Sequence, residues 1–255
     1  RETARNNDVR AQWLDLDEGS IVTGDKVIID TSNATIRGRI TGTLAVWLHN
    51  TRSGAGTVTA CSGSVMTCSS CMLQMSLTGS VVVLQGSISA TNTEIKGLRK
   101  LSHTGSMHTS GSQMVILSEA ATIHGTVTCS GAGCSSLVSV NETLELGGSL
   151  SCTSGECRMS LRSGGDMIST GNIFCSGTSG QSILSMSSGG GMISTGTVSC
   201  SGNNQCLVDV ASQESATFEG SISGSDIRMI VAASLQLKGI ISSSGQGYAE
   251  ESGPG

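Results

Sequence analysis

The chain has 255 residues, a net charge of −5, 35 glycines, one proline and only 2% aromatic residues. This composition gives no reason to expect nucleic acid as a partner, because phosphate contacts and base stacking need basic and aromatic side chains. No apolar run reaches the roughly 18 residues of a membrane-spanning helix, and the aliphatic pattern argues against disorder.

A repeating unit runs along nearly the whole chain. Each unit opens with a glycine, then any residue, then an apolar residue, and apolar and polar residues alternate after it. Such alternation predicts strands rather than helices, and a repeat of about 20 residues predicts stacked coils. The opening glycines are Gly19, Gly38, Gly56, Gly86, Gly105, Gly125, Gly148, Gly171, Gly196, Gly220 and Gly239.

We therefore expect an all-β fold, a single-stranded parallel β-helix (solenoid) of about eleven rungs, with two to three short strands per rung and disulfide-stapled turns. Glycine is expected at the rung corners because they need positive φ. Residues 1–10 are expected to form a polar N-terminal segment, residues 11–245 the β-helix domain, and residues 246–255 a flexible tail or linker. Because the chain starts at Arg1 without a signal-peptide pattern, we expect a mature or excised segment.

The rungs differ in length along the chain. The rungs from 19 and 38 are compact, the unit from 56 to 86 is the longest and contains CSGSVMTCSSC, and the rungs from 86 and 105 lack cysteine. The rungs from 125, 148, 171 and 196 carry extra residues after their first strand. Enlarged corners therefore coincide with cysteines.

The cysteines predict bridges across these enlarged corners. Ten cysteines fit an oxidising, extracellular setting. In the enlarged rungs an inward-facing cysteine follows the opening glycine by four residues, and a second begins the next strand. A bridge between them offsets part of the backbone entropy of the longer turn. The predicted pairs are Cys129–Cys134, Cys152–Cys157, Cys200–Cys206 and, with Cys68 as a competitor, Cys61–Cys71.

Two cysteines, Cys68 and Cys175, are left without an assigned partner. Ser182 stands where the partner of Cys175 is expected, so Cys175 is either a buried free thiol or paired with another rung or chain. Cys68-Ser-Ser-Cys71 has the CxxC spacing of redox and zinc sites, but no second half or histidine pair accompanies it. We therefore expect no metal and no cofactor.

The rung periodicity over residues 11–245 resembles that of the right-handed parallel β-helix, or pectin-lyase-like, proteins of the secreted and cell-surface type. The resemblance implies a relationship to polysaccharide lyases and hydrolases, phage tailspikes and surface adhesins, whose enzymes cluster acidic residues on one outer face. Here Asp166, Asp209 and Asp226 fall at different rung positions, so we assign no catalytic residue. The histidines, which we expect at the surface, show no repeated ligand spacing; they are His49, His103, His108 and His124.

The first and third positions after each opening glycine point outward and are mostly serine or threonine. Stacked rungs then predict a long, nearly uncharged hydroxyl face, interrupted at Asn172 and Phe174. These residues either simply suit outward strand positions, form an assembly surface, or bind ice. The predicted hydroxyl face comprises Thr57, Thr59, Ser87, Ser89, Thr126, Thr128, Ser149, Ser151, Thr197, Ser199, Ser221 and Ser223.

We expect a non-catalytic, extracellular structural or adhesive β-helix segment of a larger surface or filament-forming protein. Its partners would be other copies or domains of the same assembly. A carbohydrate-binding or carbohydrate-active β-helix, with glycans as partners, is one alternative, and an ice-binding protein is another. Asn33 and Asn141 begin glycosylation acceptor patterns.

Overall fold

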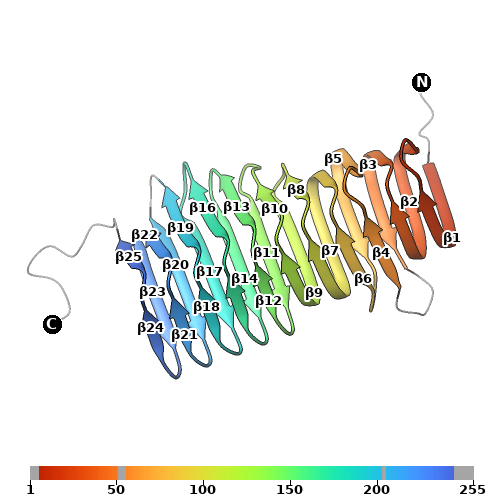
Figure 1. Ribbon diagram of the computed structural model, residues 1–255. Coiled ribbons are helices and arrows are strands. Elements are labelled where there is room, and N and C mark those ends of the chain that lie inside the picture. The colour runs from red at the N-terminus through yellow and green to blue at the C-terminus, as the bar shows by residue number, and fades with distance from the viewer. Residues whose placement is uncertain (1–5, 51–55, 203–204, 244–255) are drawn as a thin grey trace, which may run out of the picture.

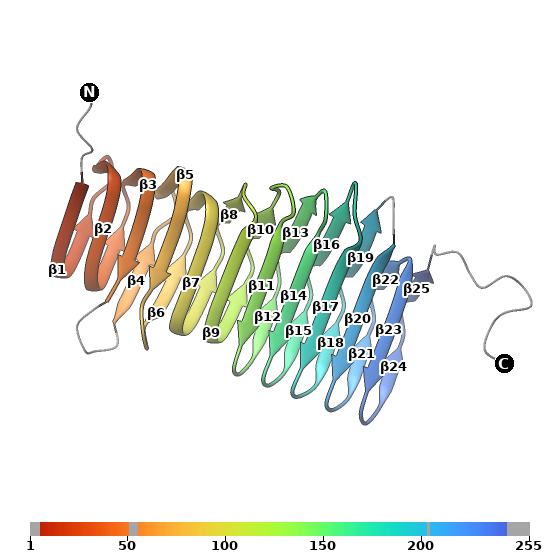
Figure 2. The ribbon, with the colours of Figure 1, turned by 180° about the vertical axis from the view of Figure 1, so that it is seen from behind.

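The computed structural model describes residues 6–50, 56–202 and 205–243, and they form a parallel β-solenoid of about ten turns. Figure 1 and, from behind, Figure 2 show an elongated rod whose coils follow one another in chain order. The described residues contain strands and turns but no helix. The predicted fold class, an all-β parallel β-helix with disulfides, is confirmed.

All 25 strands belong to one sheet that winds around the rod. Their bounds are β1 (Asn6–Leu16), β2 (Ile21–Ile36), β3 (Arg39–His49), β4 (Thr57–Ala60), β5 (Val65–Ser76), β6 (Val81–Leu84), β7 (Ser87–His103), β8 (Ser106–Thr109), β9 (Gln113–Ile123), β10 (Thr126–Cys129), β11 (Ser135–Val140), β12 (Leu144–Leu146), β13 (Ser149–Ser154), β14 (Arg158–Ser163), β15 (Met167–Ser169), β16 (Asn172–Gly177), β17 (Ser182–Ser188), β18 (Met192–Ser194), β19 (Thr197–Gly202), β20 (Cys206–Ser212), β21 (Ala216–Phe218), β22 (Ser221–Gly224), β23 (Asp226–Val231), β24 (Leu235–Leu237) and β25 (Ile240–Ser243).

The paired strands stack in three columns, which we call A, B and C. Column A holds the strand that opens each repeat and runs from residues 21–24 to β25. Column B runs from residues 6–10 to β23, and column C from residues 13–16 to β24. Each coil passes through one segment of each column, so that most strand residues of the interior coils have a structural equivalent one coil above and one coil below.

The interior is a single apolar core that follows the rod axis. Alternate residues of each strand point inward, and the same inward position is apolar in successive coils. Leu161, Met186 and Val210, which are equivalent residues of three successive coils, are fully buried. Because each inward side chain packs on the equivalent residues above and below, burial in one coil depends on its neighbours.

Most opening glycines stack on one another from coil to coil. The positive φ expected at these positions is not the reason why they are glycine. The described glycines with positive φ are Gly19, Gly63, Gly79, Gly97 and Gly133, so Gly19 is the one opening glycine among them. At the other corners the chain passes too close to the coil below to admit a side chain. A Cβ on Gly171 would lie 1.8 Å from the Gly148 carbonyl oxygen, and one on Gly196 would lie 1.9 Å from the Gly171 carbonyl oxygen. Close approach of the backbones therefore selects glycine here.

Two expected boundaries need correction. Strand β1 begins at Asn6, so residues 6–10 belong to the solenoid rather than to a separate N-terminal segment. Gly56 does not open a rung, because β4, which follows it, pairs with residues 34–36 of column C. The equivalent opening position is Ser64, since Val65 pairs with Arg39 below and Ser87 above. The predicted tail, residues 246–255, lies outside the described residues.

Candidate functional site

Four disulfides lie between the described strands. Cys129–Cys134 and Cys200–Cys206 are the same pairs that the corner spacing predicts, with Cα–Cα distances of 6.1 and 5.7 Å. Each of these two bridges closes the corner between a column A strand and the next column B strand.

The predicted Cys61–Cys71 bridge is wrong, because Cys71 pairs with Cys68. Strand β5 passes through the corner without ending, and its register with β7 shifts between Cys68 and Met72. The two cysteines flank this irregularity with Cα atoms 5.3 Å apart. Cys61 lies at the end of column C, one corner earlier, and is half-buried with a free thiol. The error follows from taking Gly56 as an opening glycine.

The predicted Cys152–Cys157 bridge is also wrong, because Cys157 pairs with Cys175 of the next coil. Cys175 is therefore not a free thiol, and Cys152 is the buried free thiol instead. The Cα–Cα distance of 6.0 Å matches that of the bridges within corners. Adjacent coils are about 4.8 Å apart, so a cysteine one coil away is as near as one across the corner. The spacing within one corner therefore does not identify the partner of Cys157.

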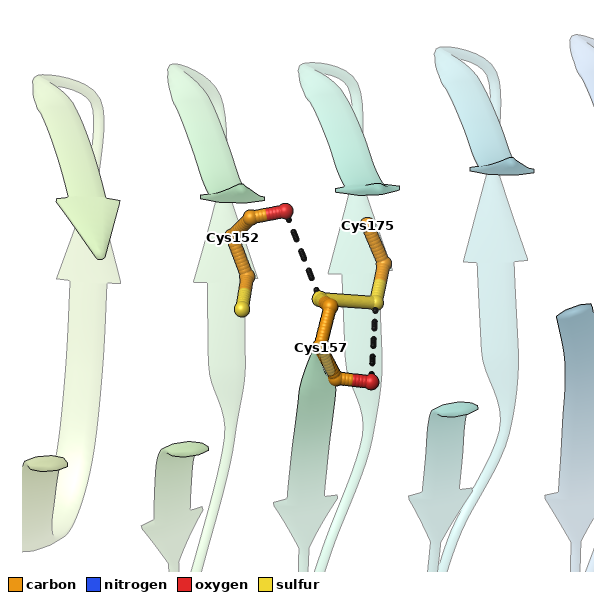
Figure 3. Close-up of side chains that lie close together, drawn as sticks. All are labelled: Cys152, Cys157 and Cys175. Carbon is orange, nitrogen blue, oxygen red and sulfur yellow. Dashed lines mark hydrogen bonds between the residues drawn. A yellow bond between two sulfur atoms is a disulfide. The ribbon is translucent and has the colours of Figure 1, made fainter. Parts of the chain in front are cut away.

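Cys152, Cys157 and Cys175 form a thiol cluster in the core. Their sulfur atoms all lie within 4.8 Å of one another, and all three residues are fully buried. Figure 3 shows the Cys157–Cys175 bridge beside the Cys152 side chain, with Cys157 Sγ 3.3 Å from the Cys152 carbonyl oxygen. The Cys152 thiol donates to the Cys134 carbonyl oxygen at 3.4 Å. Burial raises its pKa to about 11, so this thiol is protonated at neutral pH.

This arrangement supports thiol–disulfide exchange better than metal binding. Three reduced cysteines in this position would offer soft thiolate ligands, but the bridge removes two of them. The Cys152 sulfur can instead attack Cys157 as a thiolate, forming Cys152–Cys157 and releasing the Cys175 thiolate without net oxidation. The raised pKa of Cys152 makes this exchange slow, since the thiolate is the attacking species.

Most residues of the predicted hydroxyl face do lie side by side on column A. Ser223 Oγ donates to Ser199 Oγ at 2.9 Å, and Ser151 Oγ donates to Thr128 Oγ1 at 3.2 Å. Phe174, which is 37% exposed, interrupts the array. The hydroxyls therefore bond partly to one another along the rod axis. The residues of this face are Ser87, Ser89, Thr126, Thr128, Ser149, Ser151, Thr197, Ser199, Ser221 and Ser223.

Thr57 and Thr59 do not belong to this face, which corrects the prediction. They lie in β4, where Thr59 pairs with Thr35 below and Val83 above on column C. The equivalent column A residue is Thr67, paired with Thr41 and Ser89. Both errors on this coil, in the hydroxyl face and in the bridge of Cys61, have the same origin at Gly56.

One histidine, His103, is not at the surface as predicted but is fully buried in column C. It stands between Leu84 and Ile123 of the adjacent coils. Its Nε2 lies 3.3 Å from the Thr126 carbonyl oxygen, while Nδ1 is buried without a hydrogen-bond partner. Desolvation lowers the pKa of His103. His108 is exposed, as expected.

The acidic residues named from the sequence do not gather. Asp166 lines a shallow groove on the outside of column C and the turns that precede its strands. Ile168, Ile193 and Thr217 line the same groove. Its Oδ1 accepts a hydrogen bond from the Gly191 amide at 2.8 Å, which ties one coil to the next. Asp209 and Asp226 lie on column B, and the aligned neighbour of Asp209 in β23 is Arg228 rather than a second carboxylate.

The two glycosylation patterns lie in different surroundings. Asn141 is exposed at the turn before β12. Asn33 is half-buried within β2, and its Oδ1 accepts a hydrogen bond from the Thr57 amide at 3.1 Å. Access to an external enzyme is therefore better at Asn141, although both sites stay predictions.

The two terminal coils expose apolar side chains, a feature that the sequence analysis did not single out. We call residues 6–24 the first coil and residues 226–243 the last coil. In the first coil the side chain of Ile21 is 64% exposed, and in the last coil Ile240 is 71% exposed. Leu235 and Leu237 point along the core but are 43% and 48% exposed. Each of these two coils has a described neighbouring coil on one side only, which accounts for the exposure.

No helix among the described residues is long and apolar enough to cross a membrane. The fold defines the chain as a parallel β-solenoid with cross-linked corners. Neither a family model, nor a curated protein, nor a solved structure matches it.

Proposed function

We propose that this solenoid is a non-catalytic structural or adhesive segment of a larger extracellular surface or filament-forming protein. The observation that best supports the proposal is the unbroken stack of parallel coils, which the described disulfides brace along the rod. Four disulfides along one rod fit an oxidising, extracellular location.

The interior supports a mechanical rather than a catalytic role. Buried apolar side chains fill the axis of the rod from Val27 to Ile222. Asp166 is the carboxylate in the shallow groove, and its Oδ1 already accepts a hydrogen bond from the Gly191 amide. A continuous core with bridged corners resists bending and proteolysis, which suits a load-bearing segment.

Imaging of the native material tests this proposal. Antibodies against the chain, applied to an unfixed native preparation, should decorate polymers or a surface layer in electron micrographs. A native preparation in which the chain occurs only as soluble monomers that turn over a polysaccharide would contradict it and favour an enzyme related to the pectin-lyase-like type.

Glycan binding is the second candidate, supported by the groove over β15, β18 and β21. Apolar Ile193 lies there beside the hydroxyl groups of Ser215 and Thr217, a combination that suits a sugar ring and its hydroxyls. Binding to a glycan array that is lost in Thr217→Lys would support this candidate. Ice binding by the hydroxyl face is tested separately by thermal hysteresis, which we expect to be absent because Phe174 interrupts the array.

A further inference from the structure

We propose that the free thiol of the buried cluster moves along the rod by thiol–disulfide exchange, so that the folded chain holds three disulfide isomers in equilibrium. In these isomers the free thiol is at Cys129, Cys152 or Cys175, in three successive coils. The exchange between Cys152 and Cys157 is one of the two steps, and the second step involves Cys134. This inference concerns the interior of the rod and does not depend on the proposed function.

The cysteines around the cluster form two rows that follow the rod axis. The second row consists of Cys134 and Cys157, which begin column B and stand one residue before the aligned pair Ser135 and Arg158. The first row lies at the inward end of the column A strands, where the register aligns each cysteine with the next. Its members are Cys129, Cys152, Cys175 and Cys200.

Each cysteine of the second row has two possible partners in the first row, one in its own coil and one in the next coil. Cys134 is bridged to Cys129 of its own coil, with Cα atoms 6.1 Å apart. Cys157 is bridged to Cys175 of the next coil, with Cα atoms 6.0 Å apart. Both kinds of bridge therefore occur in one rod at nearly the same separation.

Cys152 has the same position relative to Cys134 as Cys175 has relative to Cys157. The Cys152 sulfur lies 3.4 Å from the Cys134 carbonyl oxygen, and the Cys175 sulfur lies 3.5 Å from the Cys157 carbonyl oxygen. Because the repeat gives the two pairs equivalent places, a Cys134–Cys152 bridge suits the fold as Cys157–Cys175 does. Cys152, which Figure 3 shows beside the second of these bridges, thus stands between two disulfides that it can attack.

Both steps balance without an external oxidant or reductant. Attack of the Cys152 thiolate on the Cys157 sulfur forms Cys152–Cys157 and breaks Cys157–Cys175, so that Cys175 leaves as the thiolate. Attack on the Cys134 sulfur forms Cys134–Cys152 and breaks the bridge to Cys129, which then leaves as the thiolate. In each step the leaving sulfur takes up the proton that Cys152 has lost, and the number of bridges stays the same.

Two hydroxyl residues limit the exchange to these three coils. Ser182 is the equivalent of Cys157 in the next coil, and it is fully buried with a hydroxyl that has no hydrogen-bond partner. A serine cannot carry a bridge, so we expect Cys200–Cys206 to stay outside the exchange. On the other side Thr109 is aligned with Cys129 and ends the first row.

The isomers differ in how they brace the rod. With the free thiol at Cys175, both exchanging bridges lie within corners, as Cys129–Cys134 and Cys152–Cys157. With the free thiol at Cys129, both bridges join neighbouring coils, as Cys134–Cys152 and Cys157–Cys175. This part of the rod can therefore gain or lose cross-links along its axis without any change in its oxidation state.

Disulfide mapping tests the exchange in the full chain, with Cys61→Ala in every sample because the Cys61 thiol is free and half-buried. The native protein is incubated at about pH 9, where more of the thiol is ionised than at neutral pH, and is then denatured at acid pH with an alkylating agent. Cleavage after Glu142, Glu156 and Arg162 puts Cys134, Cys152, Cys157 and Cys175 on four different peptides.

We expect two new bridges, Cys134–Cys152 and Cys152–Cys157, together with alkylated Cys129 and alkylated Cys175. Because the environments are equivalent, each new bridge should reach at least about a tenth of the abundance of Cys157–Cys175. Cys152→Ala is the matched control. It lacks the attacking thiol, so its two original bridges should remain unchanged after the same incubation.

A second route to the same equilibrium removes the effect of slow exchange in the folded state. The reduced chain is refolded in a mixture of reduced and oxidised glutathione, which lets every bridge form and break. A chain that holds only Cys129–Cys134 and Cys157–Cys175 by both routes would overturn the inference. Appearance of Cys152–Cys157 without Cys134–Cys152 would confine exchange to the cluster and would overturn the three positions of the thiol. Neither result bears on the proposed function, which imaging tests separately.

Ser182→Cys tests the limit of the second row. When the variant folds with oxidised glutathione as the oxidant, the new thiol should pair with Cys175 and leave Cys152 to pair with Cys157. The Cys157–Cys175 bridge should then fall at least about tenfold. Ser194→Cys, at a buried serine of column C whose hydroxyl also lacks a partner, is the control and should keep that bridge. Full retention of Cys157–Cys175 in Ser182→Cys would contradict the equivalence of the two rows.

Discussion

The two halves of the rod turn their corners differently. Up to residue 123, single strands pass through corners, so that β2 has 16 residues and β7 has 17. From β10 onward no strand is longer than 7 residues, and glycine- and serine-rich turns separate the columns. Three of the four disulfides lie in this second half. A corner is therefore held either by a continuous hydrogen-bonded ladder or by side chains that cross-link it.

Buried serines contribute to the second kind of corner. Ser163 Oγ donates to the Asp166 carbonyl oxygen at 2.8 Å, and Ser188 Oγ donates to the Gly190 carbonyl oxygen at 2.8 Å. In the next coil Ser212 Oγ donates to the same Gly190 oxygen at 2.9 Å. These hydroxyls satisfy turn carbonyls that a continuous strand would have paired with its neighbour.

The largest loss of stability is expected from substitution of a stacked opening glycine in the second half of the rod. Gly171→Ala should lower the free energy of unfolding by about 2–4 kcal/mol, because the new Cβ would lie 1.8 Å from the Gly148 carbonyl oxygen. Gly155→Ala is the control, since its Cβ would meet only the mobile end of the Ser179 side chain. Urea denaturation followed by circular dichroism would measure both, and equal stabilities would refute the close-approach argument.

The next largest loss of stability is expected from removal of a disulfide, and it should differ between the bridge that joins two coils and a bridge within one corner. Removal of the bridge across coils in Cys157→Ala/Cys175→Ala should cost about 3 kcal/mol, because it closes a loop of 18 residues. Removal of the corner bridge in Cys129→Ala/Cys134→Ala should cost about 2 kcal/mol for a separation of 5 residues. Thermal unfolding at matched scan rates would rank them. A larger loss from the short bridge would show that local corner strain, rather than loop entropy, dominates.

A smaller, pH-dependent effect is expected from His103 in the first half. Burial lowers its pKa below the usual value near 6.5, so the unfolded chain binds a proton that the folded chain excludes. Stability should therefore be unaffected above about pH 7 and should fall with decreasing pH below about 6.5, by at most about 1.4 kcal/mol per pH unit. His103→Leu, which continues the Leu84–Ile123 stack, should flatten this part of the profile.

Denaturation curves between pH 5 and 8 would check the prediction for His103. The exposed His108, replaced in the same way, serves as the control and should leave the slope in place. A wild-type profile that is flat between pH 5 and 7 would contradict the buried, unprotonated histidine.

The smallest change in stability is expected from Cys175→Ser. With its partner gone, Cys157 should pair with Cys152 when the variant folds in a buffer that contains oxidised glutathione as the oxidant, because all three sulfur atoms lie within 4.8 Å of one another. Peptide mapping under non-reducing conditions, after alkylation at low pH, should find Cys157–Cys175 in the wild type and Cys152–Cys157 in the variant. Two alkylated thiols at Cys152 and Cys157 in the variant would show that these two residues cannot form a bridge.

Much of this structure could be predicted from the repeat, and the failures are local. Period-2 alternation after each glycine fixed the strands, their inward faces and the stacking order of most coils. The coil from residue 64 to 86 was misread because Ser64 opens it without a glycine, while Gly56, in the coil before it, imitates an opening. That one substitution moved Thr57, Thr59 and Cys61 to the wrong column.

The β-solenoid fold, the inward side of each strand and the enlarged corners can be predicted from the amino-acid pattern alone, because these properties are local and repeat along the chain. The partner of Cys157, the burial of His103 and the reason for glycine at the corners become visible once the coils are stacked. Those outcomes depend on the spacing between neighbouring coils, and in a stack that spacing is as short as the distance across a corner.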